Sequence, residues 1–103
     1  MKYLTFLLLK SLLLSNFVMA ETIPTKSEIL KEASYCSKDS QAQVCKELVS
    51  EIEKLQIVEF DQNRFKCQSS LLGLQSKIIE AYFLKNFSNE QISLMLPYVI
   101  KNC

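Results

Sequence analysis

Four cysteines constrain the fold of this chain more than any other feature of its sequence. Cys36, Cys45, Cys67 and Cys103 are an even set in a chain of 103 residues, which predicts two disulfide bonds. The alternative is a zinc site. Zinc ligands need a closer cysteine spacing than any found here, and the sequence has no histidine. We therefore expect two disulfides and an oxidising compartment.

The expected helix positions favour one of the three ways to pair these cysteines. Cys36 should end one helix and Cys45 should lie near the start of the next, so a tight hairpin brings them together. Cys67 precedes a later helix and Cys103 follows the last one, so they meet if those helices are antiparallel neighbours. A Cys45–Cys67 bond is harder, because a helix of about 12 residues extends about 18 Å, although a returning loop could close that gap. The sequence predicts Cys36–Cys45 and Cys67–Cys103.

The first twenty residues have the features of a secretory signal peptide. Lys2 provides a basic start, and an interrupted apolar run extends from Leu4 to Leu14. The Val-Met-Ala sequence that ends at Ala20 matches a signal-peptidase site. A membrane span needs roughly 20 apolar residues, more than this run contains. We expect a cleaved signal peptide at residues 1–20, one domain at 21–103, a periplasmic location and no membrane contact in the mature form.

A shortage of turn-forming residues favours an all-α fold. The chain has one glycine and two prolines, whereas all-β folds need many turns. Val44, Leu48, Ile52 and Leu55 recur at helical spacing and mark the clearest helix. A chain of this size buries only a modest core. We therefore expect a small four-helix bundle or array that is braced by the two disulfides.

Capping motifs mark where the first two helices should begin. Thr25 and Glu28 form a capping box ahead of a helix over about residues 26–36. Asp39 or Ser40 should cap the second helix, because each offers an oxygen acceptor to the free amides of the first turn.

Two further helices are expected in the second half of the chain. Ser69 or Ser70 should cap the third, which is the most apolar and ends near residues 86–87. Gly73 inside its first turn is unfavourable for a helix, and a close contact with another helix is one explanation for it. A capping box that starts at Ser88 opens the last helix, which Pro97 should kink or divide.

The segment from Gln56 to Lys66 breaks the helical pattern and is predicted to be a fraying helix end and a connecting loop. Its Phe60 and Phe65 either fold into the core, which is the preferred interpretation, or lie exposed and contact a partner. Aromatic and arginine residues on loops are frequent interface anchors. The candidate contact residues come from this segment and from the turn after the first helix: Phe60, Asp61, Asn63, Arg64, Ser37 and Lys38.

The sequence lacks the side chains that most catalytic sites use. It has no histidine, the commonest general base and metal ligand, and no glycine-rich phosphate loop. Glu47 and Glu51 share a helix face, but we interpret them as part of a solvated charged surface. Residues 21–103 have 10 basic and 11 acidic groups, and no basic patch that would bind nucleic acid. We expect no enzyme, no metal and no cofactor.

The order of these features resembles a family of exported bacterial proteins. A helix, Cys36, a Ser-Lys-Asp turn and Cys45 precede a long helix, an aromatic and basic step into Cys67, an amphipathic helix and Cys103. From about Ile29 onward the pattern is similar to periplasmic immunity proteins against peptidoglycan amidases of type VI secretion (the Rap/Tai group). The resemblance implies a non-catalytic helical protein, often a homodimer, that binds a cognate toxin and blocks its active site.

Two other interpretations remain open from the sequence. The first is a periplasmic chaperone or a small assembly factor of a secretion or conjugation apparatus, with the apolar third helix forming an exposed groove. The second is a secreted eukaryotic helical polypeptide.

Overall fold

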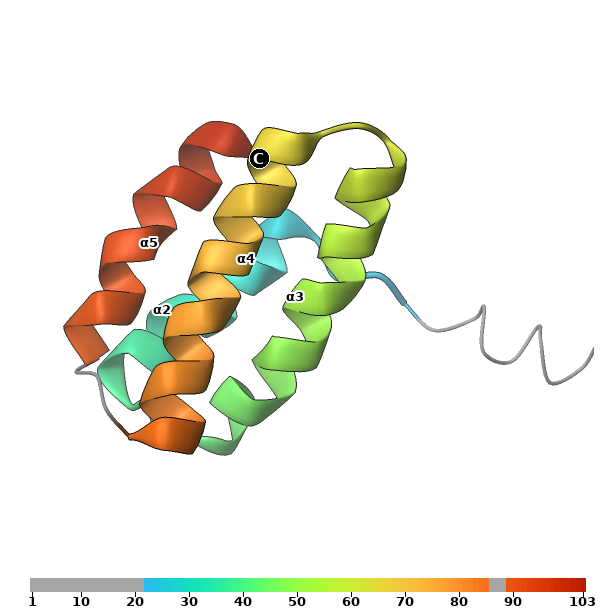
Figure 1. Ribbon diagram of the computed structural model, residues 1–103. Coiled ribbons are helices and arrows are strands. Elements are labelled where there is room, and N and C mark those ends of the chain that lie inside the picture. Colours follow the sequence, from blue (N-terminus) through green and yellow to red (C-terminus); the bar gives the residue numbers. More distant parts are fainter. Residues whose placement is uncertain (1–21, 86–88) are drawn as a thin grey trace, which may run out of the picture.

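The polypeptide folds into a bundle of α-helices that two disulfide bonds hold together (Figure 1). The computed structural model describes residues 22–85 and 89–103. Its helices are α2 (Lys26–Lys38), α3 (Gln43–Asp61), α4 (Phe65–Ile79) with a π-helical extension η1 (Glu80–Leu84), and α5 (Asn89–Asn102). The described residues contain four α-helices and no strand. The predicted all-α fold is confirmed.

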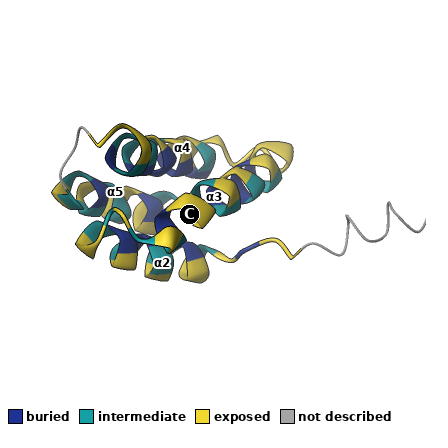
Figure 2. Ribbon diagram, turned by 90° about the horizontal axis from the view of Figure 1, so that it is seen from below, coloured by how far each residue is buried: buried dark blue, intermediate teal, exposed yellow. Residues whose placement is uncertain are grey.

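The four helices pack in a ring. Helices α2 and α4 lie on opposite sides of the bundle, and both α3 and α5 pack against each of them. Figure 2 shows this arrangement from below, with α4 and α2 on opposite sides and α5 and α3 between them. The core is formed by one apolar stripe on each helix, and its largest fully buried side chains are Ile29, Leu48, Ile52, Leu71, Leu74, Ile78, Ile92 and Val99. Their spacing of three or four residues within a helix keeps each stripe on one face.

Both disulfides form with the predicted pairing. Cys36–Cys45 closes the turn between α2 and α3, with Cα atoms 5.4 Å apart. Cys67–Cys103 joins the start of α4 to the residue after α5, with Cα atoms 4.6 Å apart. Because α3 and α4 are consecutive and antiparallel, the two bonds brace opposite ends of the bundle (Figure 1).

The segment from Gln56 to Lys66, predicted to be a fraying helix end and a connecting loop, is mostly helical, so the expected length of the loop was wrong. Helix α3 continues to Asp61 and α4 begins at Phe65, which leaves a connection of residues 62–64. Asn63 has a positive φ of 61°, a conformation that asparagine tolerates better than most residues, and this helps the chain to reverse.

The helix starts agree only in part with the predicted caps. The Thr25 hydroxyl accepts the Glu28 amide at 3.1 Å, as expected. Helix α3 starts after Ala42 without a side-chain cap. The expected cap at Asp39 or Ser40 was wrong, because the Asp39 carboxylate instead accepts an amide inside the turn and Asp39 itself ends α2.

The beginning of α4 also differs from the prediction. Since the helix already starts at Phe65, Ser69 and Ser70 lie inside it and cannot cap it. The Ser70 hydroxyl donates to the carbonyl of Lys66 at 3.0 Å and accepts the side-chain amide of Asn102 at 2.7 Å. Ser70 therefore helps to join α4 to the end of α5.

Helix α5 contains Pro97 and is not divided there, so of the two outcomes expected at this proline, a kink or a division, the division is wrong. Pro97 is exposed, and it has no amide hydrogen for the carbonyl one turn earlier in the helix. The capping box predicted at Ser88, and the helix end predicted near residues 86–87, lie outside the described residues.

Gly73 lies where α4 approaches α5, which agrees with a close helix contact as the explanation for this glycine. A Cβ atom at Gly73 would come within 2.5 Å of the Met95 Cε. We expect Gly73→Ala to change the free energy of unfolding by less than about 1 kcal/mol, because better helix propensity offsets a shift of the flexible methionine end. Gly73→Val should cost about 2 kcal/mol through overpacking. Urea unfolding measures both, and a valine variant as stable as the parent protein would contradict the close approach.

Candidate partner-binding surface

An exposed apolar surface covers the end of the bundle where α3 turns into α4. Ile57, Phe60 and Phe65 expose 58%, 55% and 52% of their surface. The Phe60 and Phe65 rings meet edge to face, with centroids 5.8 Å apart. We call these three residues the α3–α4 apolar surface. Clustered exposed side chains of this kind often mark interaction sites.

The preferred interpretation of Phe60 and Phe65 as core residues was wrong. The buried stripe of α3 runs through Ile52 and Leu55 and reaches Glu59 one turn later. Because neighbouring residues of a helix point about 100° apart, the stripe places Glu59 inside and Phe60 outside. The last turns of α3 thus reverse the usual pattern, with polar residues buried and apolar residues exposed.

Hydrogen bonds satisfy the polar side chains that this reversal buries. The Gln56 side-chain amide donates to the Gln75 carbonyl oxygen at 2.9 Å, and the Gln75 amide donates to the backbone carbonyl of Val49 at 3.0 Å. Unsatisfied polar groups at these positions would cost about 1–3 kcal/mol each. The network therefore ties α3 to α4 and leaves the apolar side chains of the last turns on the surface.

An ion pair fixes the turn beside the two phenylalanines. The Arg64 Nη2 donates to the Glu59 Oε1 at 2.9 Å, and the Arg64 Nε donates to Oε2. The backbone amide of Arg64 also donates to the Glu59 carbonyl at 2.8 Å. Glu59 is buried, whereas the Arg64 side chain is half exposed. The Glu59–Arg64 pair therefore holds the turn between α3 and α4 in one conformation beside the exposed phenylalanine rings.

Glu59 should make the protein sensitive to acid. Its hydrogen bonds with Arg64 lower the pKa of the Glu59 carboxyl, so the folded state gains stability above the ordinary carboxyl pKa and loses it as the pH falls through the lower folded-state value. We expect Glu59→Gln to cost about 1.5 kcal/mol at pH 7 and progressively less towards acid. Urea unfolding across this pH range measures the difference, and a cost that does not change with pH would contradict the assignment.

The structure separates the residues that the sequence proposed as contacts. Phe60, Asp61, Asn63 and Arg64 are all exposed at the α3–α4 end. Ser37 and Lys38 end α2 near the start of α3, and the 19 residues of that helix span about 28 Å. The six residues therefore belong to two surfaces.

Sequence reasoning missed Ile57 and Phe65, two members of the α3–α4 apolar surface, as candidate contact residues. A cavity of about 230 Å³ lies beside Phe60, lined also by Glu53, Gln56, Ile57 and Gln68. Gln68 was not a candidate either. For Ile57, the signal that could have found it is the helical spacing of Gln56 and Glu59, which continues the buried stripe and turns Ile57 outward.

Comparisons with known proteins give no match to a family model, to a curated protein or to a solved structure. Over residues 22–85 and 89–103, no group of acidic, cysteine or histidine side chains is arranged to hold a metal ion. None of the helices in the same ranges is both long enough and apolar enough to cross a membrane.

Proposed function

We propose that this chain is an exported, non-catalytic binding protein, an immunity protein that binds and blocks a cognate peptidoglycan amidase of type VI secretion. The observation that carries the proposal is the exposed, paired rings of Phe60 and Phe65 at the α3–α4 end. The resemblance of the cysteine and helix pattern to immunity proteins gives the class of partner.

The α3–α4 apolar surface is suited to tight binding because it is ordered before a partner arrives. Both rings belong to helices that are joined by a short turn, and the Glu59–Arg64 pair fixes that turn. Side chains that are already placed lose less conformational entropy on binding. Two aromatic anchors beside a shallow cavity are a common arrangement for the energetic centre of a protein interface.

The covalent structure supports an exported role. Two disulfides in so short a chain favour an oxidising compartment such as the periplasm. The proposed mature protein starts at Glu21, after a signal peptide of residues 1–20. N-terminal sequencing of periplasmic protein should therefore begin with Glu-Thr-Ile-Pro, and a sequence that begins with Met1 would contradict the cleavage.

Co-expression with an amidase-like toxin that is encoded by a neighbouring gene tests the proposed function. We expect the exported protein to protect cells in which the toxin is directed to the periplasm, and to co-purify with it. A toxin that remains fully lethal would contradict the immunity role.

A chaperone or assembly factor is the alternative that the same exposed surface could serve. A chaperone binds many unfolded clients weakly, whereas an immunity protein binds one folded partner tightly. Suppression of the aggregation of unrelated unfolded proteins, lost in Phe60→Ala, would favour the chaperone.

A further inference from the structure

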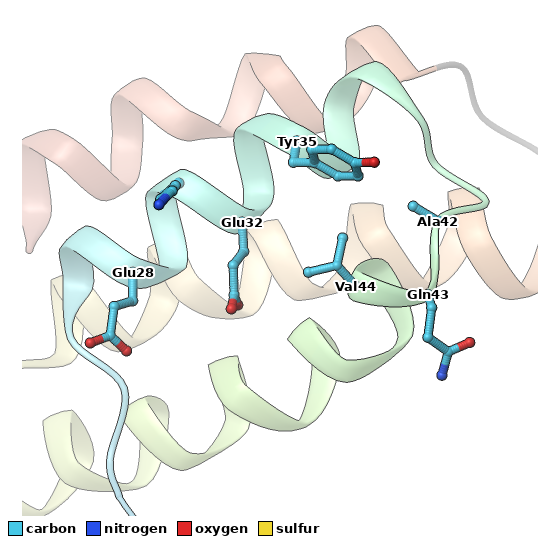
Figure 3. Close-up of a pocket in the computed structure, with 7 residues that line it drawn as sticks. Glu28, Glu32, Tyr35, Ala42, Gln43 and Val44 are labelled. Carbon is cyan, nitrogen blue, oxygen red and sulfur yellow. The ribbon is translucent and has the colours of Figure 1, made fainter.

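A second concave surface lies between α2 and the start of α3 (Figure 3). This α2–α3 groove has a volume of about 630 Å³ and is lined by Glu28, Lys31, Glu32, Tyr35, Ala42, Gln43 and Val44. Figure 3 shows Glu28 and Glu32 projecting from α2 towards α3, with Tyr35 and Val44 nearer the turn. The groove therefore combines two carboxylates and one lysine, a net negative charge, with a partly apolar part.

Negative charges on both helices act on Glu32. Partial burial raises the pKa of Glu32, and the negative charges of Glu51, Glu28 and Glu47 raise it further, while Lys31 opposes them. Glu47 and Glu51, interpreted from the sequence as part of a solvated surface, thus influence Glu32 on α2, although neither lines the groove. Glu51 also has Lys54 at 3.9 Å. Nearby like charges disfavour the ionised form of Glu32, and a cation bound in the groove would relieve this repulsion.

The apolar part of the groove narrows the choice of cation. The Tyr35 ring is 57% exposed and lines the groove together with Val44. An aromatic face attracts a guanidinium or ammonium group, and apolar walls suit the aliphatic stem of such a side chain. Arginine fits best, because its planar group can stack on a ring and donate to a carboxylate at the same time.

We propose that the α2–α3 groove binds a basic segment of a partner protein, with an arginine side chain placed between Glu32 and Tyr35. The complementary charge of the groove and the exposed ring within it support this occupant. The groove contains none of the residues of the α3–α4 apolar surface, and the proposal does not depend on the partner being an amidase.

A fluorescein-labelled peptide of alternating arginine and leucine, titrated into the oxidised protein and followed by fluorescence anisotropy, tests the charge requirement. The control peptide has citrulline in place of arginine, which keeps the shape and removes the charge. We expect the arginine peptide to bind at least about tenfold more tightly, as two or more partly exposed ion pairs and a ring contact would give. Equal binding of the two peptides, or no binding of either, would overturn the proposal.

Single substitutions test whether the arginine peptide binds in the α2–α3 groove. Glu32→Gln should weaken binding of the arginine peptide about fivefold and Tyr35→Leu about threefold. Glu53→Gln is the matched control, since it removes one charge from α3 outside the groove, and it should change binding less than about twofold. Equal losses in Glu32→Gln and Glu53→Gln would show non-specific attraction and overturn the site.

Two further measurements show whether a loss of peptide binding comes from the groove itself: the stability of the Glu32→Gln variant, and peptide binding by a variant far from the groove. Glu32→Gln should make the free protein more stable at pH 7, because it removes a repelled charge, so weaker binding cannot be due to unfolding. Phe60→Ala should leave peptide binding unchanged, which separates this groove from the α3–α4 apolar surface. A dimer of the parent protein that Glu32→Gln abolishes would assign the groove to a second copy instead and overturn the proposal.

Discussion

Replacement of Cys67 and Cys103 by alanine is expected to lower the free energy of unfolding by about 4 kcal/mol. The bond joins residues 36 apart in sequence, so its loss frees a long loop in the unfolded chain. The total stability of a domain is often only about 5–15 kcal/mol, so this bond accounts for a large share. Alanine is preferred to serine because Cys67 is buried and a hydroxyl there would add a second cost.

The Cys36–Cys45 bond provides the matched comparison. Its cysteines are 9 apart in sequence, and removal of this shorter loop should cost about 2.5 kcal/mol under the same chain-entropy model. Urea unfolding of the two double-alanine variants and of the oxidised parent protein shows which disulfide contributes more to the free energy of unfolding. A larger loss from the short loop than from the long one would contradict an entropic origin of the stabilisation.

Replacement of Phe60 and Phe65 by alanine should have the largest effect on partner binding. Each aromatic anchor is expected to contribute about 2 kcal/mol to the affinity for the cognate toxin. Because the two rings touch, the double variant should differ from the sum of the single losses by about 0.5–1.5 kcal/mol. Calorimetric titration of the parent protein and of the single and double variants with the toxin gives the four affinities of this double-mutant cycle.

The unfolding stability of each variant and one control substitution show whether a loss of affinity comes from the α3–α4 apolar surface itself. Both rings are half exposed, so each alanine variant should lose less than about 1 kcal/mol of unfolding free energy. Leu94 on α5 is equally exposed, at 56%, and Leu94→Ala should leave the affinity unchanged. A cooperative loss of fold in Phe60→Ala would mean that the ring supports the core. Equal losses of affinity in Leu94→Ala and Phe60→Ala would remove the α3–α4 apolar surface from the interface.

Much of the architecture was predictable because it follows from covalent and periodic features of the sequence. The disulfide pairing needs only the approximate ends of the helices, and Gly73 signals a close helix approach through the cost of a glycine inside a helix. The hydroxyl of Thr25 accepts the amide three residues ahead, as the capping motif indicates.

The candidate site was less predictable, because its residues violate the pattern on which the prediction depends. A search for apolar residues at helical spacing ends α3 near Leu55, where Gln56 and Glu59 take over the buried stripe. Their burial depends on Gln75 from α4 and on Arg64 beyond the turn. Such partners are not visible until the turn itself is known, so Phe60 was assigned to the core. The candidate residue Arg64 was exposed as expected, but its pairing with Glu59 was not foreseen.

The influence of α3 carboxylates on Glu32 in the α2–α3 groove was missed for a similar reason. Helical spacing within α3 shows that Glu47 and Glu51 share a face, but it does not show which helix lies opposite. The packing of α2 brings Glu32 within the influence of both charges. Contacts between helices therefore bring a charged face of α3 close enough to act on a groove residue of α2.

The central claim is that this protein binds and blocks a cognate amidase toxin. Inhibition, by the oxidised protein, of a toxin encoded by a neighbouring gene tests this claim most directly. Peptidoglycan hydrolysis by that toxin would be measured with rising amounts of the parent protein, of the Phe60→Ala/Phe65→Ala variant and of Leu94→Ala. We predict that the parent protein and Leu94→Ala abolish hydrolysis near equimolar amounts, whereas the double variant requires at least about 100-fold more. Full hydrolysis in the presence of excess parent protein, or equal inhibition by the folded double variant, would contradict it.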